Sequence, residues 1–168
     1  METQSRLTLK GHYDVVCLDR NGNVKWQESA PNLITNAGLD YLLDVALSGA
    51  TATTTWYLGL KGTGSPAAGD TMSSHAGWSE ITPYSDANRI TWQEGGVSSQ
   101  SITNSGNVAA FTINATSTVY GIFLTSDNTK SGTSGTLFSA TNFSSSRAVE
   151  SGDTLNVTYT VSAADDGA

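Results

Sequence analysis

The alternation of apolar and polar residues along the chain predicts a protein built mainly of short β-strands. It is clearest over residues 154–162 (TLNVTYTVS), where every second side chain is apolar. A strand points successive side chains to opposite faces, so this segment is expected to bury one face and expose the other. The residues of the expected buried face are Leu155, Val157, Tyr159 and Val161.

The N-terminal part of the chain predicts a β-hairpin. Residues 7–19 alternate in the same way, and a second run over residues 24–28 follows the pair Asn21-Gly22. Asn-Gly favours a two-residue type I′ turn, because both central residues of that turn need a positive φ. Pro31 is expected to end the second strand, since proline has no N–H to donate to a sheet.

One helix is predicted, inserted over about residues 37–48. Its apolar residues recur at helical spacing and are Leu39, Leu42, Leu43, Ala46 and Leu47. Asn36 is expected to cap its N-terminus, and Gly49 is expected to end it. Asp40 and Asp44 are expected on its exposed face.

Further strands are predicted where β-branched and aromatic residues cluster between Gly, Ser and Asn turns. They cover residues 53–60, 89–93, 99–102, 108–113, 118–125, 136–139 and 147–149. Residues 62–70 and 126–135 contain no large apolar side chain and are predicted to be surface loops. Residues 70–75 are predicted to form one helical turn capped by Asp70, which brings Trp78 into the core.

Eight or more short strands with one inserted helix indicate an all-β fold, either a jelly roll or a two-sheet β-sandwich. Strand spacing leaves both architectures open. A chain of 168 residues is the size of one domain with one core, so residues 1–168 are expected to form a single domain. The two ends, residues 1–6 and 163–168, have little to bury and are expected to be flexible.

The composition predicts a nearly neutral surface. Ser, Thr, Asn and Gly account for 73 of the 168 residues, and charged residues for only 14%, against about 25% in an average soluble domain. The net charge is -7, and the eight Lys and Arg are scattered singly. Without a basic patch, neither nucleic acid nor an anionic membrane is an expected partner. The longest apolar run falls short of the about 20 residues that a membrane span needs.

Candidate chemistry is sparse along the chain. His12 and His75 have no further ligands at metal-site spacing, no G-x-S-x-G motif occurs, and the glycine-rich loops do not match a phosphate-binding loop. No catalytic residue, metal or cofactor is therefore predicted. Cys17 is interpreted as a buried small hydrophobic residue that has no internal disulfide partner. With no secretory signal pattern at the N-terminus, synthesis in a cytoplasm is expected.

The four tryptophans have two possible roles. Trp56 and Trp78 stand among apolar residues and are predicted to fill the core. Trp26 and Trp92 alternate with polar neighbours. For these two the sequence leaves open whether they are buried or form an exposed platform that binds sugars.

Six sequence segments occur together in one order. They are NLITNAGLDYLLD (32–44), WYLGL (56–60), DTMSSHAGWSE (70–80), RITW (89–92), GIFLTSDNTKSGTSGTLFSA (121–140) and GDTLNVTYTV (152–161). In this order, over roughly residues 32–162, they resemble a group of small virion proteins of tailed bacteriophages. Some small jelly-roll proteins of this kind act as cement, or decoration, proteins on the capsid exterior.

The resemblance implies a non-enzymatic structural protein that is synthesised in the host bacterial cytoplasm and binds the outside of the capsid. There it would stabilise contacts between subunits of the major capsid protein. A homo-oligomer is expected, either a dimer or a trimer at a lattice axis. The alternative is a module of the tail or a fibre that anchors the fibre or binds a host-surface glycan. An enzyme such as a glycan hydrolase is the least favoured hypothesis.

The expected contact residues lie in the N-terminal segment and in the two long loops, because a binding role would explain loops of that length. They are Met1, Glu2, Thr3, Gln4, Ser5, Arg6, Thr63, Ser65, Pro66, Asn128, Thr129 and Lys130. Truncation of residues 1–6 is therefore expected to weaken binding to the particle without unfolding the domain.

Overall fold

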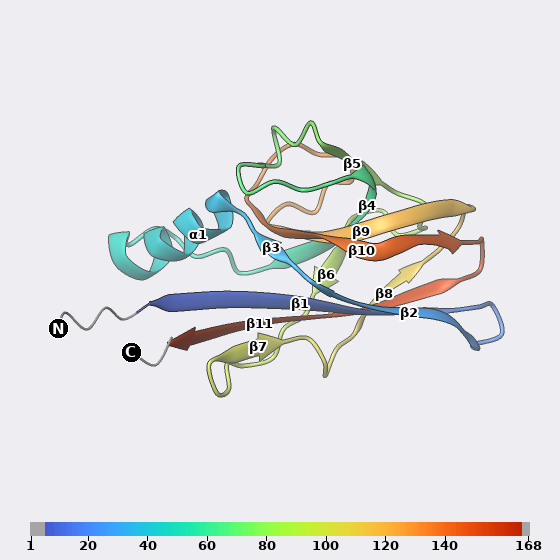
Figure 1. Ribbon diagram of the computed structural model, residues 1–168, viewed down its shortest axis with the longest axis horizontal. Helices are drawn as coiled ribbons and strands as arrows, with labels where there is room; N and C mark the ends of the chain where they lie inside the picture. Colours follow the sequence, from blue (N-terminus) through green and yellow to red (C-terminus); the bar gives the residue numbers. More distant parts are fainter. Residues whose placement is uncertain (1–5, 166–168) are drawn as a thin grey trace.

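Two antiparallel β-sheets pack face to face in the structure, a computed structural model that describes residues 6–165 (Figure 1). The strands of the first sheet are β1 (Leu7–Leu18), β2 (Val24–Pro31), β7 (Ser101–Thr103), β8 (Ala109–Thr112) and β11 (Thr154–Asp165). They are ordered β2–β1–β11–β7, and β8 also pairs with β11. The first sheet therefore has the two long strands β1 and β11 at its centre.

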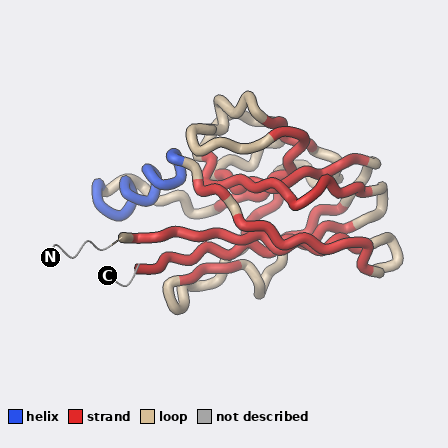
Figure 2. Tube along the Cα trace, in the orientation of Figure 1, coloured by secondary structure: helices blue, strands red, loops and turns tan. Residues whose placement is uncertain are grey.

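The second sheet is formed by the middle of the chain. Its strands are β3 (Leu33–Ile34), β4 (Trp56–Gly64), β5 (Trp78–Ile81), β6 (Ile90–Trp92), β9 (Ser117–Thr125) and β10 (Leu137–Val149). They are ordered β3–β10–β9–β4–β5, and β6 also pairs with β4. One short helix, α1 (Asn36–Leu43), continues into a single turn of π-helix, η1 (Asp44–Ser48), between β3 and β4 (Figure 2). The predicted all-β fold with one short inserted helix is confirmed, and of the two architectures that the sequence left open the structure is consistent with the β-sandwich.

The N-terminal hairpin forms, and β2 ends at Pro31 as predicted, but the turn is longer than expected. Asp19 N–H donates to the carbonyl of Asn23 (2.8 Å), and Gly22 N–H donates to the carbonyl of Asp19 (2.9 Å). Gly22 has a φ of 83° and Asn21 does not have a positive φ, so the predicted type I′ turn is wrong. The Asp19 carboxylate favours the longer turn because it accepts hydrogen bonds from the N–H groups of Asn21 (2.8 Å) and Asn23 (2.9 Å).

The strands predicted over 136–139 and 147–149 are parts of one long strand, β10. It pairs with β9 on both sides of a register shift between Asn142 and Arg147. The intervening Ser-rich run has the composition of a turn but forms a bulge, which redirects side chains instead of ending the strand. Phe143 points into the core, and Arg147 forms an ion pair with Glu28 of β2. The bulge thereby ties one edge of the second sheet to the first.

Helix α1 differs from the prediction at its start. Its cap is Thr35 rather than Asn36, because the Thr35 Oγ1 accepts a hydrogen bond from the Gly38 N–H (3.0 Å). Its end is as predicted, since Gly49 follows η1 in the left-handed conformation with a φ of 77°. Gly38 is the buried residue of α1, and a Cβ there would lie 2.4 Å from the Phe138 carbonyl oxygen. The helix therefore approaches β10 closely at its first turn.

Strand β4 is longer than predicted, and the segment after it is not helical. β4 extends to Gly64, so the expected loop of 62–70 begins at residue 65. Within 70–75, Thr71 and Ser74 exchange backbone hydrogen bonds of 3.0 and 3.2 Å in a tight turn. The predicted helical turn is thus wrong. Trp78 is nevertheless buried, as predicted.

The C-terminal strand also exceeds its predicted length. β11 continues to Asp165, and its last three residues pair with residues 7–9 of β1. The expectation of a flexible end is therefore wrong for residues 163–165. Of the remaining residues of the two expected flexible ends, Arg6 is exposed just before β1, and residues 1–5 and 166–168 lie outside the described residues.

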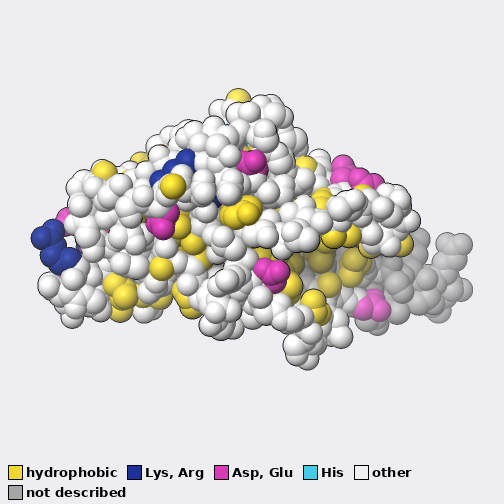
Figure 3. Space-filling view, turned by 180° about the vertical axis from the view of Figure 1, so that it is seen from behind, with side chains coloured by type: hydrophobic (Ala, Val, Ile, Leu, Met, Phe, Trp, Pro, Cys, Tyr) yellow, Lys and Arg dark blue, Asp and Glu magenta, His cyan; other side chains and the backbone are white. Residues whose placement is uncertain are grey.

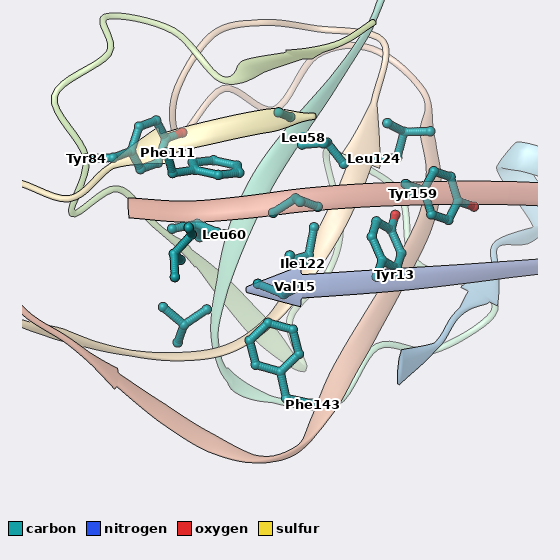
Figure 4. Close-up of a cluster of buried hydrophobic side chains, with 14 of the residues drawn as sticks. Tyr13, Val15, Leu58, Leu60, Tyr84, Phe111, Ile122, Leu124, Phe143 and Tyr159 are labelled. Carbon is teal, nitrogen blue, oxygen red and sulfur yellow. The ribbon is translucent and has the colours of Figure 1, made fainter. Parts of the chain in front are cut away.

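The main core lies between the two sheets (Figure 4). Alternate residues of β1 and β11, including Tyr13 and Tyr159, face alternate residues of β4 and β9, including Leu58 and Leu124. The rings of Tyr13 and Tyr159 stack with centroids 4.0 Å apart. Ser139 of β10 bonds both phenols, at 2.8 and 3.0 Å, so a polar contact joins the sheets inside the apolar core.

Candidate functional site

The structure brings two of the predicted contact loops together over the outer face of the second sheet, at the top of Figure 1. We call the β4–β5 loop (residues 65–77) and the β9–β10 loop (residues 126–136) the loop cap. Beneath it lies a second, smaller hydrophobic core. Its members are Met72, Trp78, Phe123, Leu137 and Ala140. The loop cap is therefore a packed part of the fold rather than a pair of free loops.

The second core explains why the central strands are apolar on both faces. In β9, Ile122 and Leu124 point into the main core, whereas Phe123 points outward beneath the loop cap. Gly59 of β4 pairs directly with Phe123, and a Cβ at Gly59 would lie 2.2 Å from the Phe123 ring. A glycine is thus needed where the ring lies flat over the neighbouring strand.

A buried ion pair fixes the β9–β10 loop. Arg89 donates to both oxygens of the Glu80 carboxylate, from Nε at 3.0 Å and from Nη2 at 2.7 Å. Its remaining donors reach the carbonyls of Asp127 and Gly132, both at 2.9 Å. Glu80 Oε2 also accepts a hydrogen bond from the Ser131 N–H (2.8 Å). The charged pair therefore supplies the backbone groups of this loop with hydrogen bonds that water would otherwise make.

Two further contacts fix the loop cap. The Lys130 ammonium donates to the Tyr84 carbonyl (2.8 Å) and lies 3.9 Å from the centroid of the Tyr84 ring. The Asp70 carboxylate accepts hydrogen bonds from the Trp78 indole (2.9 Å) and the Ala67 N–H (2.8 Å). Asp70 was predicted to cap a helical turn, and it stabilises a non-helical loop instead.

The predicted contact residues fall into two places. In and beside the loop cap, Thr63, Ser65 and Thr129 are exposed, Pro66 and Asn128 are half-buried, and the Lys130 ammonium is engaged within the protein. Arg6 is exposed just before β1, at the end of the sandwich near α1 (Figure 1). Met1, Glu2, Thr3, Gln4 and Ser5 lie outside the described residues. The sequence predicted contact residues in the N-terminal segment and in two loops without placing these segments relative to one another. In the fold, Arg6 lies apart from the loop cap.

A shallow hollow of about 440 Å³ lies between the two loops of the cap. His75, Trp78 and Glu80 line it from one side and Ser131 and Thr133 from the other. The imidazole of His75 stacks on the Trp78 indole with centroids 4.1 Å apart. The hollow thus offers polar loop atoms and one aromatic face to a bound partner.

Lys61 lies fully buried on β4 next to the second core, a feature that sequence analysis missed. Its ammonium donates to the carbonyls of Gly62 (3.0 Å) and Gly64. Among the described residues no carboxylate pairs with it, and burial lowers the pKa of Lys61 to about 8. The signal in the sequence was the position of this lysine directly after the apolar run WYLGL.

Three exposed side chains on the first sheet have the residue types of a catalytic triad but not its geometry. The Ser29 hydroxyl lies 2.6 Å from His12 Nε2 and donates to Asp14 Oδ1 at 2.6 Å. The same His12 nitrogen lies 3.2 Å from Asp14 Oδ1. In a triad the imidazole joins serine and carboxylate through its two different nitrogens. This cluster instead closes on one nitrogen, which is typical of a surface hydrogen-bond network.

Cys17 is buried, as predicted, and is not activated. Burial and the nearby Asp153 carboxylate raise the pKa of the thiol to about 12. The Asp153 carboxylate is bonded instead to the Lys25 ammonium (2.7 Å). The thiol is therefore protonated at neutral pH and lacks the thiolate character that nucleophilic catalysis requires.

The tryptophans favour packing over sugar binding. Trp78 and Trp92 are buried, with exposed fractions of 6% and 5%. Trp92 donates its indole N–H to the Tyr159 carbonyl (3.2 Å), so it cannot form an exposed platform. Trp26 and Trp56 are half-buried and pack against the main core. The proposed platform residue Trp92 is therefore excluded by its position.

Among residues 6–165 no three His, Cys, Asp or Glu side chains lie together in a way that would hold a metal ion, and no helix there is long and apolar enough to cross a bilayer. Comparison with known protein families finds no family that matches the chain, and comparison with curated proteins finds no similar sequence.

Proposed function

We propose that this chain is a non-enzymatic structural protein of a tailed-phage virion that binds the outer capsid surface as a cement protein, with the loop cap as its contact surface. The observation that carries the proposal is the ordered state of the loop cap. Both loops are made mainly of Ser, Thr, Gly and Asn; the buried pair of Glu80 and Arg89 fixes the β9–β10 loop, and Asp70 fixes the β4–β5 loop. The sequence resemblance to phage virion proteins supplies the partner, the major capsid protein.

A rigid loop surface suits this role because binding then loses little conformational entropy. The charged groups of the loop cap are directed into the protein, as the Asp70 and Lys130 contacts show. Its exposed atoms are therefore mostly neutral hydrogen-bonding groups. Such a surface makes modest contacts with each neighbour, and repetition on a lattice adds them into stable attachment.

The proposal is tested by counting copies in purified virions that contain this chain. Quantitative mass spectrometry against the major capsid protein is expected to give a copy number of the same order as the equivalent sites of the capsid lattice. A few copies per particle would contradict a cement role. Immunogold labelling at the tail would favour the alternative, a tail or fibre module.

The contact surface is tested by rebinding of purified protein to particles that lack it. Ser65→Arg together with Thr129→Arg adds bulk and charge to the loop cap at two exposed positions, and occupancy is expected to fall at least tenfold. The matched control is Asn107→Arg, an exposed position in the turn between β7 and β8. Equal loss of occupancy in both proteins would show that the loop cap is not the contact surface.

A further inference from the structure

One end of the sandwich exposes large apolar side chains, and we call it the apolar end. Its residues and their exposed fractions are Leu7 (73%), Leu39 (39%), Leu43 (58%), Leu47 (81%) and Val97 (73%). Among the described residues, the other exposed large hydrophobic side chains are Val24 and Val108. Figure 3 shows hydrophobic side chains gathered in a hollow at this end. Clustering of this kind marks an interaction surface.

A groove of about 310 Å³ opens between the two sheets at the apolar end. Tyr41 and Leu42 of α1 and Trp56 of β4 line one side. Ile102 of β7 and Val161 of β11 line the other. No residue that lines it carries a charge. The main core is thus open to solvent at this end of the sandwich.

Leu39 and Leu43 of α1 and Leu47 of η1 form a projecting leucine stripe beside the groove. They are spaced four residues apart, which places them along one side of a helix, and their exposure rises from Leu39 to Leu47 as the helix leaves the body of the sandwich. The helix is held firmly, because the Tyr41 ring packs edge-on against Trp56 (5.0 Å) and its hydroxyl accepts a hydrogen bond from the Thr53 N–H (2.8 Å). The stripe is therefore fixed before any partner binds.

We propose that the apolar end is a two-fold self-association surface, in which the leucine stripe of each copy packs into the groove of the other. The same end carries both the projecting and the hollow apolar surface, so a single two-fold axis covers both in both copies. An apolar cavity of about 150 Å³ takes one benzene molecule. The groove is about twice that size and has room for two leucine side chains, which matches the two most exposed residues of the leucine stripe, Leu43 and Leu47.

A second copy fits the groove better than the remaining chain does. Residues 1–5 and 166–168 contain a single large apolar side chain, Met1, and two acidic residues, Glu2 and Asp166. Five large apolar side chains are exposed at the apolar end. The projecting leucines of another copy supply an apolar surface that covers them, and Asp40 and Asp44 of the same helix are exposed beside these leucines.

The charge of the chain gives this association a characteristic salt dependence. Two copies with a net charge of -7 each repel one another, while the groove itself is uncharged. Salt screens the repulsion and leaves apolar contact intact. The dimer is therefore expected to tighten as salt rises, whereas docking of a basic partner would weaken.

The test is sedimentation equilibrium of the full chain alone, so its outcome is independent of any virion partner. Wild type is expected to be a dimer at about 10 µM, with a dissociation constant that falls between 0.05 and about 0.5 M salt. Leu43→Glu with Leu47→Glu is expected to weaken association at least 100-fold. Val97→Glu, on the other side of the groove, is expected to do the same and does not involve the helix. Val24→Glu, the matched control, is expected to remain dimeric.

Circular dichroism and thermal melting of each variant establish that it is folded before it is compared. A wild-type monomer at 100 µM, a trimer, or an open-ended series of oligomers would overturn the two-fold arrangement. Dimers that survive both Leu43→Glu with Leu47→Glu and Val97→Glu would place the interface elsewhere. Dissociation by Val24→Glu alone would do the same.

Discussion

The Arg89 guanidinium binds both carboxylate oxygens of Glu80, at 3.0 and 2.7 Å, beneath loops that contain few apolar residues. Both side chains are almost completely buried. A buried pair of this geometry is a weak source of net stability but is costly to break, because the remaining charge loses its partner. Its structural effect is to hold the carbonyls of the β9–β10 loop, and this gives the molecule one rigid loop surface.

Glu80→Gln is expected to lower the free energy of unfolding by about 3 kcal/mol, because the buried Arg89 loses the carboxylate that binds it through both oxygens and keeps only the Asp127 carboxylate, 3.7 Å away. Hydrogen exchange is expected to quicken over residues 126–136 while β1 and β11 stay protected. The matched control is Glu150→Gln, which removes an exposed carboxylate 3.9 Å from Lys25. It is expected to change stability by less than about 1 kcal/mol. Equal effects of the two substitutions would contradict the role given to Glu80.

The contribution of Lys61 is expected to raise stability with pH between about 8 and 10.5, and above about pH 9 the raised pKa of Cys17, about 12 in the folded protein, opposes it. The pKa of Lys61 is lowered from 10.5 to about 8 in the folded protein, so over this interval the lysine of the unfolded chain holds more protons than that of the folded one. Raising the pH then favours folding. Below pH 8 the lysine is charged in both states, and the penalty for burying it is fully present. Urea unfolding between pH 7.5 and 9.5 measures the slope before tyrosines ionise.

Lys61→Met is expected to flatten this slope and to stabilise the protein at pH 7 by about 2 kcal/mol, since the buried charge is removed. The gain is reduced by the carbonyls of Gly62 and Gly64, which lose a donor. Lys10→Met, at an exposed position of β1, is the control and is expected to keep the wild-type slope. An unchanged slope in Lys61→Met would show that another group causes it.

Gly38→Ala is expected to destabilise the protein by more than about 2 kcal/mol, although alanine favours a helix over glycine by about 1 kcal/mol. The added Cβ would lie 2.4 Å from the Phe138 carbonyl oxygen, which is too close for two atoms that are not bonded. Because this oxygen belongs to the backbone, it cannot move away as easily as the end of a flexible side chain. Thermal unfolding measures the effect. Gly49→Ala, in open space with a φ of 77°, is expected to cost about 1 kcal/mol from its left-handed backbone alone. A stabilised Gly38→Ala protein would contradict the close packing of α1.

Cys17 is expected to react with a disulfide reagent only when the protein unfolds. Its thiol is buried and has a raised pKa of about 12, so at pH 8 the thiolate is scarce and inaccessible. The labelling rate is expected to rise with denaturant in parallel with unfolding measured by tryptophan fluorescence. Rapid labelling in native buffer would show that the first sheet opens locally around Cys17.

The regular strands and the main core were predictable from local pattern. The alternation of apolar and polar residues in β1 and β11 indicates a sheet that packs one face against the core. Leu155, Val157 and Tyr159 are buried as that pattern predicts. The bulge in β10 was not predictable, because its Ser-rich run has the composition of a turn. Whether such a run turns or bulges depends on the neighbouring strand, and here β9 continues to pair with β10 on both sides of it.

The candidate surfaces, like the bulge in β10, could not be predicted from local sequence pattern. Sequence alone determined that the chain is all-β with one short helix, because the periods of 2 and 3.6 residues are local properties of strand and helix. Tertiary structure decided that Glu80 and Arg89 meet, that two separate loops form one cap, and that Leu43 and Leu47 face solvent. These outcomes depend on which segments become neighbours after folding, and local periodicity carries no information about contacts between distant residues.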